Sequence, residues 1–169
     1  MNKTIFITGA AKRIGKEIAL TFKELGWNII IHYNSSKEAA NDLAAEINNS
    51  NANSAVTVQG NLDVKEDVEK IISEVLDAFP SIDLLINNAS TFYPTPIDDI
   101  SEDHWEKLIG SNLKGPMFLI KGLKQKLKES NGSIINITDT NLSKGVANYS
   151  IYSAAKAGLE AITKGLARE

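Results

Sequence analysis

The sequence predicts an α/β fold built on a doubly wound parallel sheet, with residues 1–169 forming a single domain. Two observations predict this class. Short runs rich in β-branched residues alternate with longer segments whose apolar residues recur at helical spacing, and this alternation is typical of parallel sheets buried on both faces. Right-handed crossovers between strands then give an expected strand order of 3-2-1-4-5. No internal repeat, low-complexity tract or domain linker interrupts the pattern.

The first three strands are expected at residues 4–7, 28–32 and around 55–58. The helix between the first two strands ends at Gly26. Its apolar residues recur at helical spacing: Ile14, Ile18, Phe22 and Leu25. The helix between the second and third strands is marked in the same way by Ala40, Leu43, Ala44 and Ile47.

A third helix with a clear apolar face comes next, and Pro80 closes it. That face consists of Val68, Ile71, Ile72, Val75, Leu76 and Phe79. The fourth strand is expected at Ile82 and residues 84–86, and the fifth at residues 133–137.

A long helical region is expected from about residue 101 to 129, between the fourth and fifth strands. Ser101, followed by two acidic residues, is a good N-terminal cap for it. Gly110 and Gly115–Pro116 are expected to bend or split the region. Its lysines are expected to form a solvated face near the helix end: Lys121, Lys124, Lys126 and Lys128.

The last helix is expected to run from about Tyr149 to the end of the chain. The helical pattern still continues at Glu169, and no sixth strand follows. We interpret this abrupt stop as a truncation, so that the C-terminal part of the domain is expected to be missing.

Composition and charge exclude several classes of function. The chain is 43% hydrophobic and 23% charged, as soluble globular proteins are, and its net charge of −3 gives no support to a nucleic-acid or membrane-surface role. It has no cysteine, which excludes disulfides and thiolate sites, and His32 and His104 lie too far apart for metal-ligand spacing. No stretch resembles a signal peptide or a membrane span. We therefore expect a cytoplasmic protein without a metal.

The turn Thr-Gly-Ala-Ala-Lys-Arg-Ile-Gly at residues 8–15 follows the first strand and opens a helix. Gly9 and Gly15 let backbone N–H groups and the helix N-terminus approach a phosphate, and Thr8 helps to hold the turn. Arg13 stands where such turns usually have glycine, and it adds positive charge. The alternative is a tight turn whose glycines serve packing alone.

The end of the second strand bears on the choice of nucleotide. An NAD site usually has an acidic residue there for the ribose 2′-hydroxyl. This chain instead has a run of polar residues, His32, Tyr33, Asn34, Ser35 and Ser36. Hydroxyl and amide donors near a cationic arginine suit a 2′-phosphate, and hence NADP(H). A polar loop that caps the next helix is compatible with the same residues.

Tyr152 and Lys156 are four residues apart at the start of the last helix and share one helical face. The pKa of an ordinary tyrosine is about 10, so its hydroxyl is a poor acid or base at neutral pH. A nearby ammonium group stabilises the phenolate and lowers that pKa. The pair is a candidate general acid with its tuning group, although this spacing also arises by chance on amphipathic helices.

Four features together resemble the short-chain dehydrogenase/reductase family. They are the turn at residues 8–15, the sequence Asn-Asn-Ala-Ser at 87–90, Asn112 in the long helix, and Tyr152 with Lys156. They follow the order of the family and cover essentially the whole chain. The resemblance implies a Rossmann-like fold, nicotinamide-dependent hydride transfer and a homo-oligomer, either a dimer or a tetramer.

The resemblance also implies roles for individual residues. Tyr152 is the expected general acid, Lys156 is expected to hold the nicotinamide ribose and tune Tyr152, and Asn112 is expected to support a water in a proton relay. Asn88 and Ala89 are expected on the adenosine-ribose side. The residues expected to bind NADP(H) are Thr8, Gly9, Arg13, Ile14, Gly15, His32, Tyr33, Asn34, Ser35, Ser36, Asn61, Leu62, Asn88, Ala89, Ser90, Tyr152 and Lys156.

The chain departs from the common family pattern at several positions. Arg13 replaces the middle glycine of the turn, Ser90 replaces the glycine of Asn-Asn-Ala-Gly, and Asn61 replaces an aspartate that contacts adenine. Asp139 stands thirteen residues before Tyr152, where a serine is usual. A serine hydroxyl donates a hydrogen bond to a substrate carbonyl, whereas an ionised aspartate only accepts one. An aspartate beside a tyrosine therefore suits an imine-like C=N acceptor, unless Asp139 merely caps a loop in an impaired enzyme.

Two of these departures, Arg13 and Asp139, together with Tyr152, Lys156 and the sequence NNASTFYPTP at 87–96, resemble the pteridine reductase branch of the family. In that branch the arginine contacts cofactor phosphate and pterin, the serine that matches Ser90 binds the ligand, and the aromatic that matches Phe92 stacks on it. Phe92 otherwise has no obvious core role beyond a local hydrophobic staple. The expected substrate-binding residues are Arg13, Ser90, Phe92, Asp139 and Tyr152, and the expected catalytic residues are Asp139, Tyr152, Lys156 and Asn112.

Three hypotheses follow. The first is an NADPH-dependent reductase of a pterin or dihydrofolate-like small molecule. The second is a general carbonyl or 3-oxoacyl-thioester reductase of the same family, which the missing serine at position 139 disfavours. The third is a non-catalytic NADP-binding fragment, since the abrupt stop predicts weak or no activity.

Overall fold

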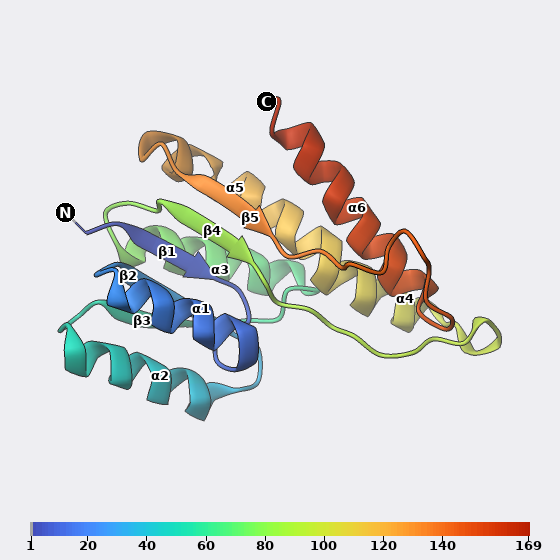
Figure 1. Ribbon diagram of the computed structural model, residues 1–169, viewed down its shortest axis with the longest axis horizontal. Helices are drawn as coiled ribbons and strands as arrows, with labels where there is room; N and C mark the ends of the chain where they lie inside the picture. The colour runs from blue at the N-terminus through green and yellow to red at the C-terminus, as the bar shows by residue number, and fades with distance from the viewer. Residues whose placement is uncertain (1) are drawn as a thin grey trace.

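The computed structural model describes residues 2–169 as a five-stranded sheet between two layers of helices (Figure 1). The strands are β1 (Thr4–Ile7), β2 (Asn28–Tyr33), β3 (Ala55–Gln59), β4 (Leu84–Asn87) and β5 (Ser133–Asn136). Every pairing is parallel, in the order β3-β2-β1-β4-β5. The predicted fold class and strand order are confirmed.

The helices divide between the two faces of the sheet. One face is covered by α1 (Arg13–Glu24) and α2 (Lys37–Ser50), and the other by α3 (Lys65–Ala78) and α5 (Gly115–Glu129) (Figure 1). The remaining helical elements are a 3₁₀ turn η1 (Ile97–Asp99), α4 (Glu102–Ile109), a π turn η2 (Gly110–Lys114) and α6 (Ser150–Leu166). α6 packs mainly against α4 and the π turn, and it also contacts β5, where Asn136 Nδ2 donates to Thr163 Oγ1 at 2.8 Å.

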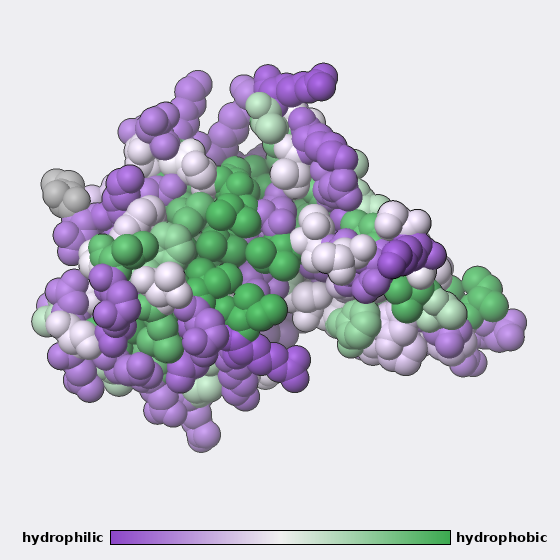
Figure 2. Space-filling view, viewed as in Figure 1, coloured by the Kyte–Doolittle hydropathy of each residue, from purple (hydrophilic) through white to green (hydrophobic). Residues whose placement is uncertain are grey.

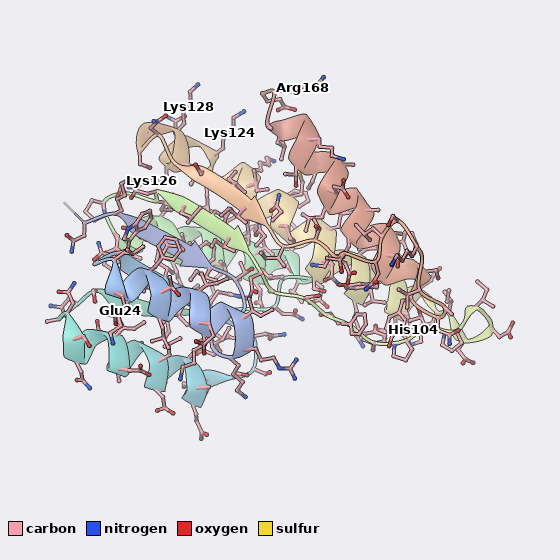
Figure 3. All side chains as sticks on the ribbon, in the orientation of Figure 1. Glu24, His104, Lys124, Lys126, Lys128 and Arg168 are labelled. Carbon is pink, nitrogen blue, oxygen red and sulfur yellow. The ribbon has the colours of Figure 1, made fainter. Side chains whose placement is uncertain are left out.

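Successive side chains of β1 and β2 point to opposite faces of the sheet, so each face has its own hydrophobic core. Ile5 and Ile7 pack under α1 and α2, whereas Phe6 and Ile30 pack under α3 and α5. Because both faces of these central strands are covered, their sequences are continuous apolar runs, as expected for buried parallel strands. Lys124 and Lys128 point away from the fold near the end of α5 (Figure 3), which confirms a solvated face there.

The long helical region is split at Gly110 and Gly115, as predicted. Ser101 Oγ accepts the backbone N–H of His104 at 3.2 Å, so the predicted cap is confirmed. α4 then passes into the π turn, in which the backbone N–H of Gly115 donates to Gly110 O. A side chain at Gly110 would collide with Asp63, so the close approach of this turn to the end of β3 requires glycine. π turns of this kind often occur at functional sites.

Several predicted boundaries are wrong by a few residues. α3 ends at Ala78, so Phe79 lies beyond it, and β4 begins at Leu84, so Ile82 precedes it. β5 ends at Asn136 rather than residue 137. α6 ends at Leu166 instead of continuing to Glu169, because the N–H of Arg168 turns back to Gly165 O. Helix ends depend on such local bonds, which hydrophobic spacing does not reveal.

Two surface properties complete the fold. Apolar side chains reach the surface over β4 and β5 (Figure 2). Ile135 of β5 is 45% exposed. Within residues 2–169, every helix is too short or too polar to cross a membrane. The five strands end at one edge of the sheet, and the loops that follow them carry the candidate site.

Candidate active site

The turn after β1 has the geometry of a phosphate-binding turn. Gly9 has a φ of +63°, a region that favours glycine. A Cβ on Gly15 would overlap Gly9 O and lie 2.8 Å from Ala10 Cα. The absence of a side chain at residue 15 therefore lets α1 begin directly against the turn, with the unpaired N–H groups of its first residues facing the pocket.

Arg13 also lies in the left-handed region, with a φ of +53°. This conformation is uncommon for a residue with a side chain and costs roughly 1–2 kcal/mol relative to the right-handed region. Arg13 is exposed and lines the pocket, together with the neighbouring Lys12. Sequence reasoning missed Lys12, although its position beside Arg13 in the same turn was a usable signal.

Thr8 and Asn88 hold the turn against the end of β4. Thr8 Oγ1 accepts the backbone N–H groups of Asn88 at 2.9 Å and Ala89 at 3.0 Å. In return, Asn88 Nδ2 donates to Thr8 O at 2.8 Å and Gly9 O at 3.2 Å. The Thr8 side chain thus bonds to the backbone that follows β4, and the Asn88 side chain bonds to the backbone of the turn.

A pocket of about 390 Å³ lies between this turn and the ends of β2, β3 and β4. Its size is in the range of small-molecule sites. The residues predicted for NADP(H) that line it are Gly9, Arg13, Ile14, Gly15, His32, Asn34, Asn61, Leu62, Asn88, Ala89 and Ser90. Thr91 and Ser111 also line it and were not predicted. The pocket does not include Thr8, Tyr33, Ser35, Ser36, Tyr152 and Lys156.

The residues after β2 divide into buried and exposed ones. Tyr33 is buried, and Asn34 is exposed, with its amide donating to Asn61 Oδ1 at 3.4 Å. Ser36 is the N-cap residue of α2, but its side chain makes no capping hydrogen bond. The capping alternative therefore accounts for the position of Ser36 and not for its hydroxyl.

Tyr152, Asp139 and Lys156 meet at the start of α6. Tyr152 Oη donates to Asp139 Oδ2 at 2.9 Å, and the other carboxylate oxygen accepts the N–H of Asn141 at 2.7 Å. Lys156 is buried and donates from Nζ to Ile137 O at 2.9 Å. The structure thus brings together the three residues predicted from the family resemblance.

The electrostatics of this group differ from the expectation. Burial, and then the hydrogen bond and charge of Asp139, raise the pKa of Tyr152 to about 12, against a smaller lowering by Ser90. The predicted lowering by Lys156 is wrong for this state, because burial and Asp139 raise the pKa of Tyr152 and Lys156 is not among the groups that shift it. Burial also lowers the pKa of Lys156 to about 8. The N–H of Asn141, and next Tyr152, lower the pKa of Asp139. The result is a neutral phenol hydrogen-bonded to a carboxylate anion.

Asn112 lies in the π turn and is fully buried. Its Oδ1 accepts from Ser90 Oγ at 2.8 Å, and its Nδ2 donates to Thr91 O and Leu108 O, both at 2.9 Å. Asn112 therefore anchors the loop after β4, and its carbonyl oxygen holds the serine that was predicted to bind the ligand.

Phe92 is 57% exposed, but one face of its ring is covered. It stacks on Tyr149 with ring centroids 4.5 Å apart and planes at 13°, and meets Tyr152 edge-on at 4.8 Å. Sequence reasoning missed Tyr149, which lies at the end of a long exposed loop. The N–H of Thr95 donates to Asn148 O at 2.6 Å and joins that loop to the one carrying Phe92.

The arrangement combines a pocket of small-molecule size with the Tyr152 hydroxyl beside an exposed aromatic ring. Among the residues that the structure describes, no group of three or more histidine or acidic side chains is placed to hold a metal ion. The fold and the site place the protein in the class of nucleotide-binding α/β oxidoreductases. The family described as short chain dehydrogenase matches residues 3–169, so the chain belongs to the short-chain dehydrogenase/reductase family.

Similar proteins carry several names. The chain is 36% identical over 170 residues to a 3-oxoacyl-[acyl-carrier-protein] reductase of Staphylococcus epidermidis, covering 100% of this chain and 69% of that protein. It is 37% identical over 164 residues to a protein of the same name from Synechocystis, covering 96% and 66%. A short-chain type dehydrogenase/reductase of Picea abies is 30% identical over 176 residues, covering 99% and 65%.

These names confirm the predicted family and enzyme class. They match the carbonyl or 3-oxoacyl-thioester alternative better than the pterin hypothesis. The resemblance to pteridine reductases rests on Arg13, Phe92 and Asp139, and the relatives' names do not support that finer assignment.

Proposed function

We propose that the chain is the nucleotide-binding and proton-donating part of an NADPH-dependent reductase that acts on a pterin or dihydrofolate-like ring. The observation that carries this proposal is the 2.9 Å hydrogen bond from Tyr152 Oη to Asp139 Oδ2. A carboxylate cannot donate to a substrate carbonyl as a serine hydroxyl does. It can hold the tyrosine hydroxyl in place beside a C=N group whose nitrogen must gain a proton.

The residues present fit a phosphorylated dinucleotide. Gly15 lacks the side chain that would fill the cradle, and the first N–H groups of α1 have no partner within the helix. Lys12 and Arg13 supply positive charge at the same pocket, and the run from His32 to Ser36 contains no acid to repel a 2′-phosphate. When bound, NADPH supplies the hydride.

The protein's own groups then manage the substrate and the proton. Tyr152 is the proton donor, and Asp139 fixes the direction of its hydroxyl. Lys156, held by Ile137 O, places an ammonium group within 6.0 Å of the Tyr152 ring centroid. The exposed ring of Phe92 offers a planar surface for a heteroaromatic substrate, since stacking between planar rings is favourable.

A second candidate is the reduction of a 3-oxoacyl thioester. The names of the relatives from Staphylococcus epidermidis and Synechocystis favour it. Under this function Tyr152 itself has to polarise the ketone oxygen, because Asp139 offers no donor while it is ionised. The two candidates therefore differ chiefly in the role of residue 139.

We further propose a homo-oligomer, a dimer or a tetramer. Phe118 of α5 is exposed and lines a second pocket of about 360 Å³ between α3 and α5. An apolar side chain beside such a hollow is suited to contact a second copy. Sedimentation analysis of the wild type and of Phe118→Lys tests this, and a monomer at all concentrations would contradict it.

A panel of NADPH-oxidation assays tests the proposed function. The chain is offered dihydropterin, dihydrofolate, quinonoid dihydropterin and a 3-oxoacyl thioester, with NADPH binding measured separately by fluorescence. Faster turnover of a pterin supports the first candidate, whereas turnover of the thioester alone replaces it with the second. Binding of NADPH without turnover of any substrate supports the non-catalytic fragment.

A further inference from the structure

We propose that His32 is a positioning residue that ties the phosphate-binding turn to the opposite wall of the nucleotide pocket, through one hydrogen bond from each ring nitrogen. It was predicted as a residue that binds NADP(H), and the geometry points to an indirect role instead. This inference rests on the nucleotide-binding part of the proposed function and is independent of the substrate.

Both ring nitrogens of His32 are engaged by backbone groups. Nδ1 accepts the N–H of Gly9 at 3.1 Å, and Nε2 lies 3.0 Å from Gly60 O. A carbonyl oxygen is only an acceptor, so Nε2 carries the proton and Nδ1 carries the lone pair. The ring is 2% exposed and meets Phe6 edge-on. One tautomer therefore satisfies both contacts.

The two backbone groups belong to different walls of the pocket. Gly9 lies in the turn after β1, and Gly60 precedes Asn61 and Leu62, which line the pocket after β3. Gly60 is itself closely packed, since a Cβ there would lie 2.8 Å from Ile71 Cδ1. A shift of the ring would move both walls together.

His32 also determines which N–H groups remain for a phosphate. Its side chain takes the N–H of Gly9, and its carbonyl oxygen accepts the N–H of Ala10 at 2.9 Å. The turn is thereby fixed, and the donors left facing the pocket are the first N–H groups of α1. Phosphate binding is thus directed to the helix N-terminus, next to Arg13.

The contact with Gly9 requires a neutral ring. Burial lowers the pKa of His32 to about 4, with a smaller opposing effect of the bond to Gly60. At neutral pH, Nδ1 therefore keeps its lone pair. A buried histidine that merely fills space would not need this pairing of one acceptor and one donor.

Two substitutions separate the two hydrogen bonds. In His32→Asn, the amide oxygen takes the place of Nδ1 and retains the bond from Gly9. In His32→Gln, the amide nitrogen takes the place of Nε2 and retains the bond to Gly60. Thr4→Val is the matched control, because Thr4 is also fully buried in the sheet but lies at the opposite edge, and its hydroxyl has no partner.

We expect His32→Gln to weaken NADPH binding about tenfold, because it leaves the Gly9 N–H unpaired and the turn loose. His32→Asn is expected to remain within about threefold of the wild type, and Thr4→Val to bind as the wild type does. Amide hydrogen exchange of Gly9, measured without NADPH, is expected to accelerate in His32→Gln and not in His32→Asn. The imidazole ¹⁵N shifts of the wild type are expected to show the Nε2–H tautomer.

Equal NADPH affinity in the two variants would overturn the inference, as would losses of affinity that simply follow the melting temperatures of the two variants. An Nδ1–H tautomer would overturn it as well. A wild-type chain that binds no NADPH contradicts the proposed function instead. In that case, the amide hydrogen exchange of Gly9 alone tests the inference, and equal exchange rates in the two variants would overturn it.

Discussion

The two halves of the site are built differently. The turn after β1 is fixed from two sides by hydrogen bonds, with buried Thr8 and half-buried Asn88 toward β4 and buried His32 toward β3. The half proposed to donate the proton lies on α6 and two long loops, where Asp139 is held by its neighbour Asn141 and Phe92 stacks on Tyr149. The turn is thus held by hydrogen bonds to two other strand ends, whereas Asp139 and Phe92 contact residues of the long loops and the start of α6. Changes in one half are expected to leave the other intact.

The largest effect is expected for Tyr152→Phe, which removes the proton donor. Turnover should fall about a thousandfold, in line with general acid catalysis. NADPH affinity should stay within about twofold of the wild type, because Tyr152 makes none of the contacts that hold the turn. Single-turnover NADPH oxidation and fluorescence titration measure the two quantities. Equal losses of turnover and of NADPH affinity would show that the two halves of the site do not act separately.

Acid is expected to weaken the nucleotide half through His32. Its pKa is about 4 in the folded chain and 6.5 ordinarily, so the unfolded chain binds the extra proton first as pH falls. The free energy of unfolding should therefore decline between pH 6.5 and 4, by up to about 3 kcal/mol. Urea titrations across this range measure the decline. His32→Asn serves as the control, and a profile as steep as that of the wild type would refute the assignment.

A smaller effect is expected for Asp139→Asn. Loss of the charged acceptor should lower pterin turnover about thirtyfold and lower the pKa of Tyr152 from about 12, because Asp139 is among the causes that raise it. The alkaline limb of the pH–rate profile should move to lower pH. Thr140→Ala, at an exposed neighbouring position, is the control. An unchanged turnover would remove Asp139 from the mechanism.

The smallest effect concerns Arg13→Gly. The substitution relieves the left-handed conformation and should raise the free energy of unfolding by about 1 kcal/mol or less, since glycine also loses more entropy on folding. NADPH affinity should fall about tenfold through the lost charge. Lys12→Ala removes a charge without changing a positive φ, and should lower affinity alone. Melting curves of both variants measure the effect of backbone strain on stability. NADPH titrations measure the effect of the lost charge on affinity.

The sequence predicted the parts of the molecule that local patterns encode. Buried strands such as β1 and β2 are continuous apolar runs, and Ser101 followed by acidic residues is a local capping signal. The grouping of the candidate catalytic residues was also predictable in part, since Asp139, Tyr152 and Lys156 follow a family spacing.

Other features depend on contacts between distant segments. Tyr149 reaches Phe92 only because two loops are joined at Thr95 and Asn148. The high pKa of Tyr152 arises from its burial and from Asp139, whereas the spacing of Tyr152 and Lys156 by itself predicts a lowered pKa. No pattern along β2 shows that the ring of His32 turns towards Gly9 and Gly60.

The tight contact of Gly15 with the turn has a consequence for protein engineering. Its missing Cβ site is bounded by Gly9 O, by Ala10 Cα and by the Asn88 amide nitrogen, which come from two strand ends. A substitution at residue 15 cannot be accommodated by moving one neighbour, because the amide of Asn88 also bonds to Gly9 O. Anyone who recombines this protein with a relative should exchange residues 8–15 and 87–90 as one block. A crossover between these two segments would separate residues that pack against each other.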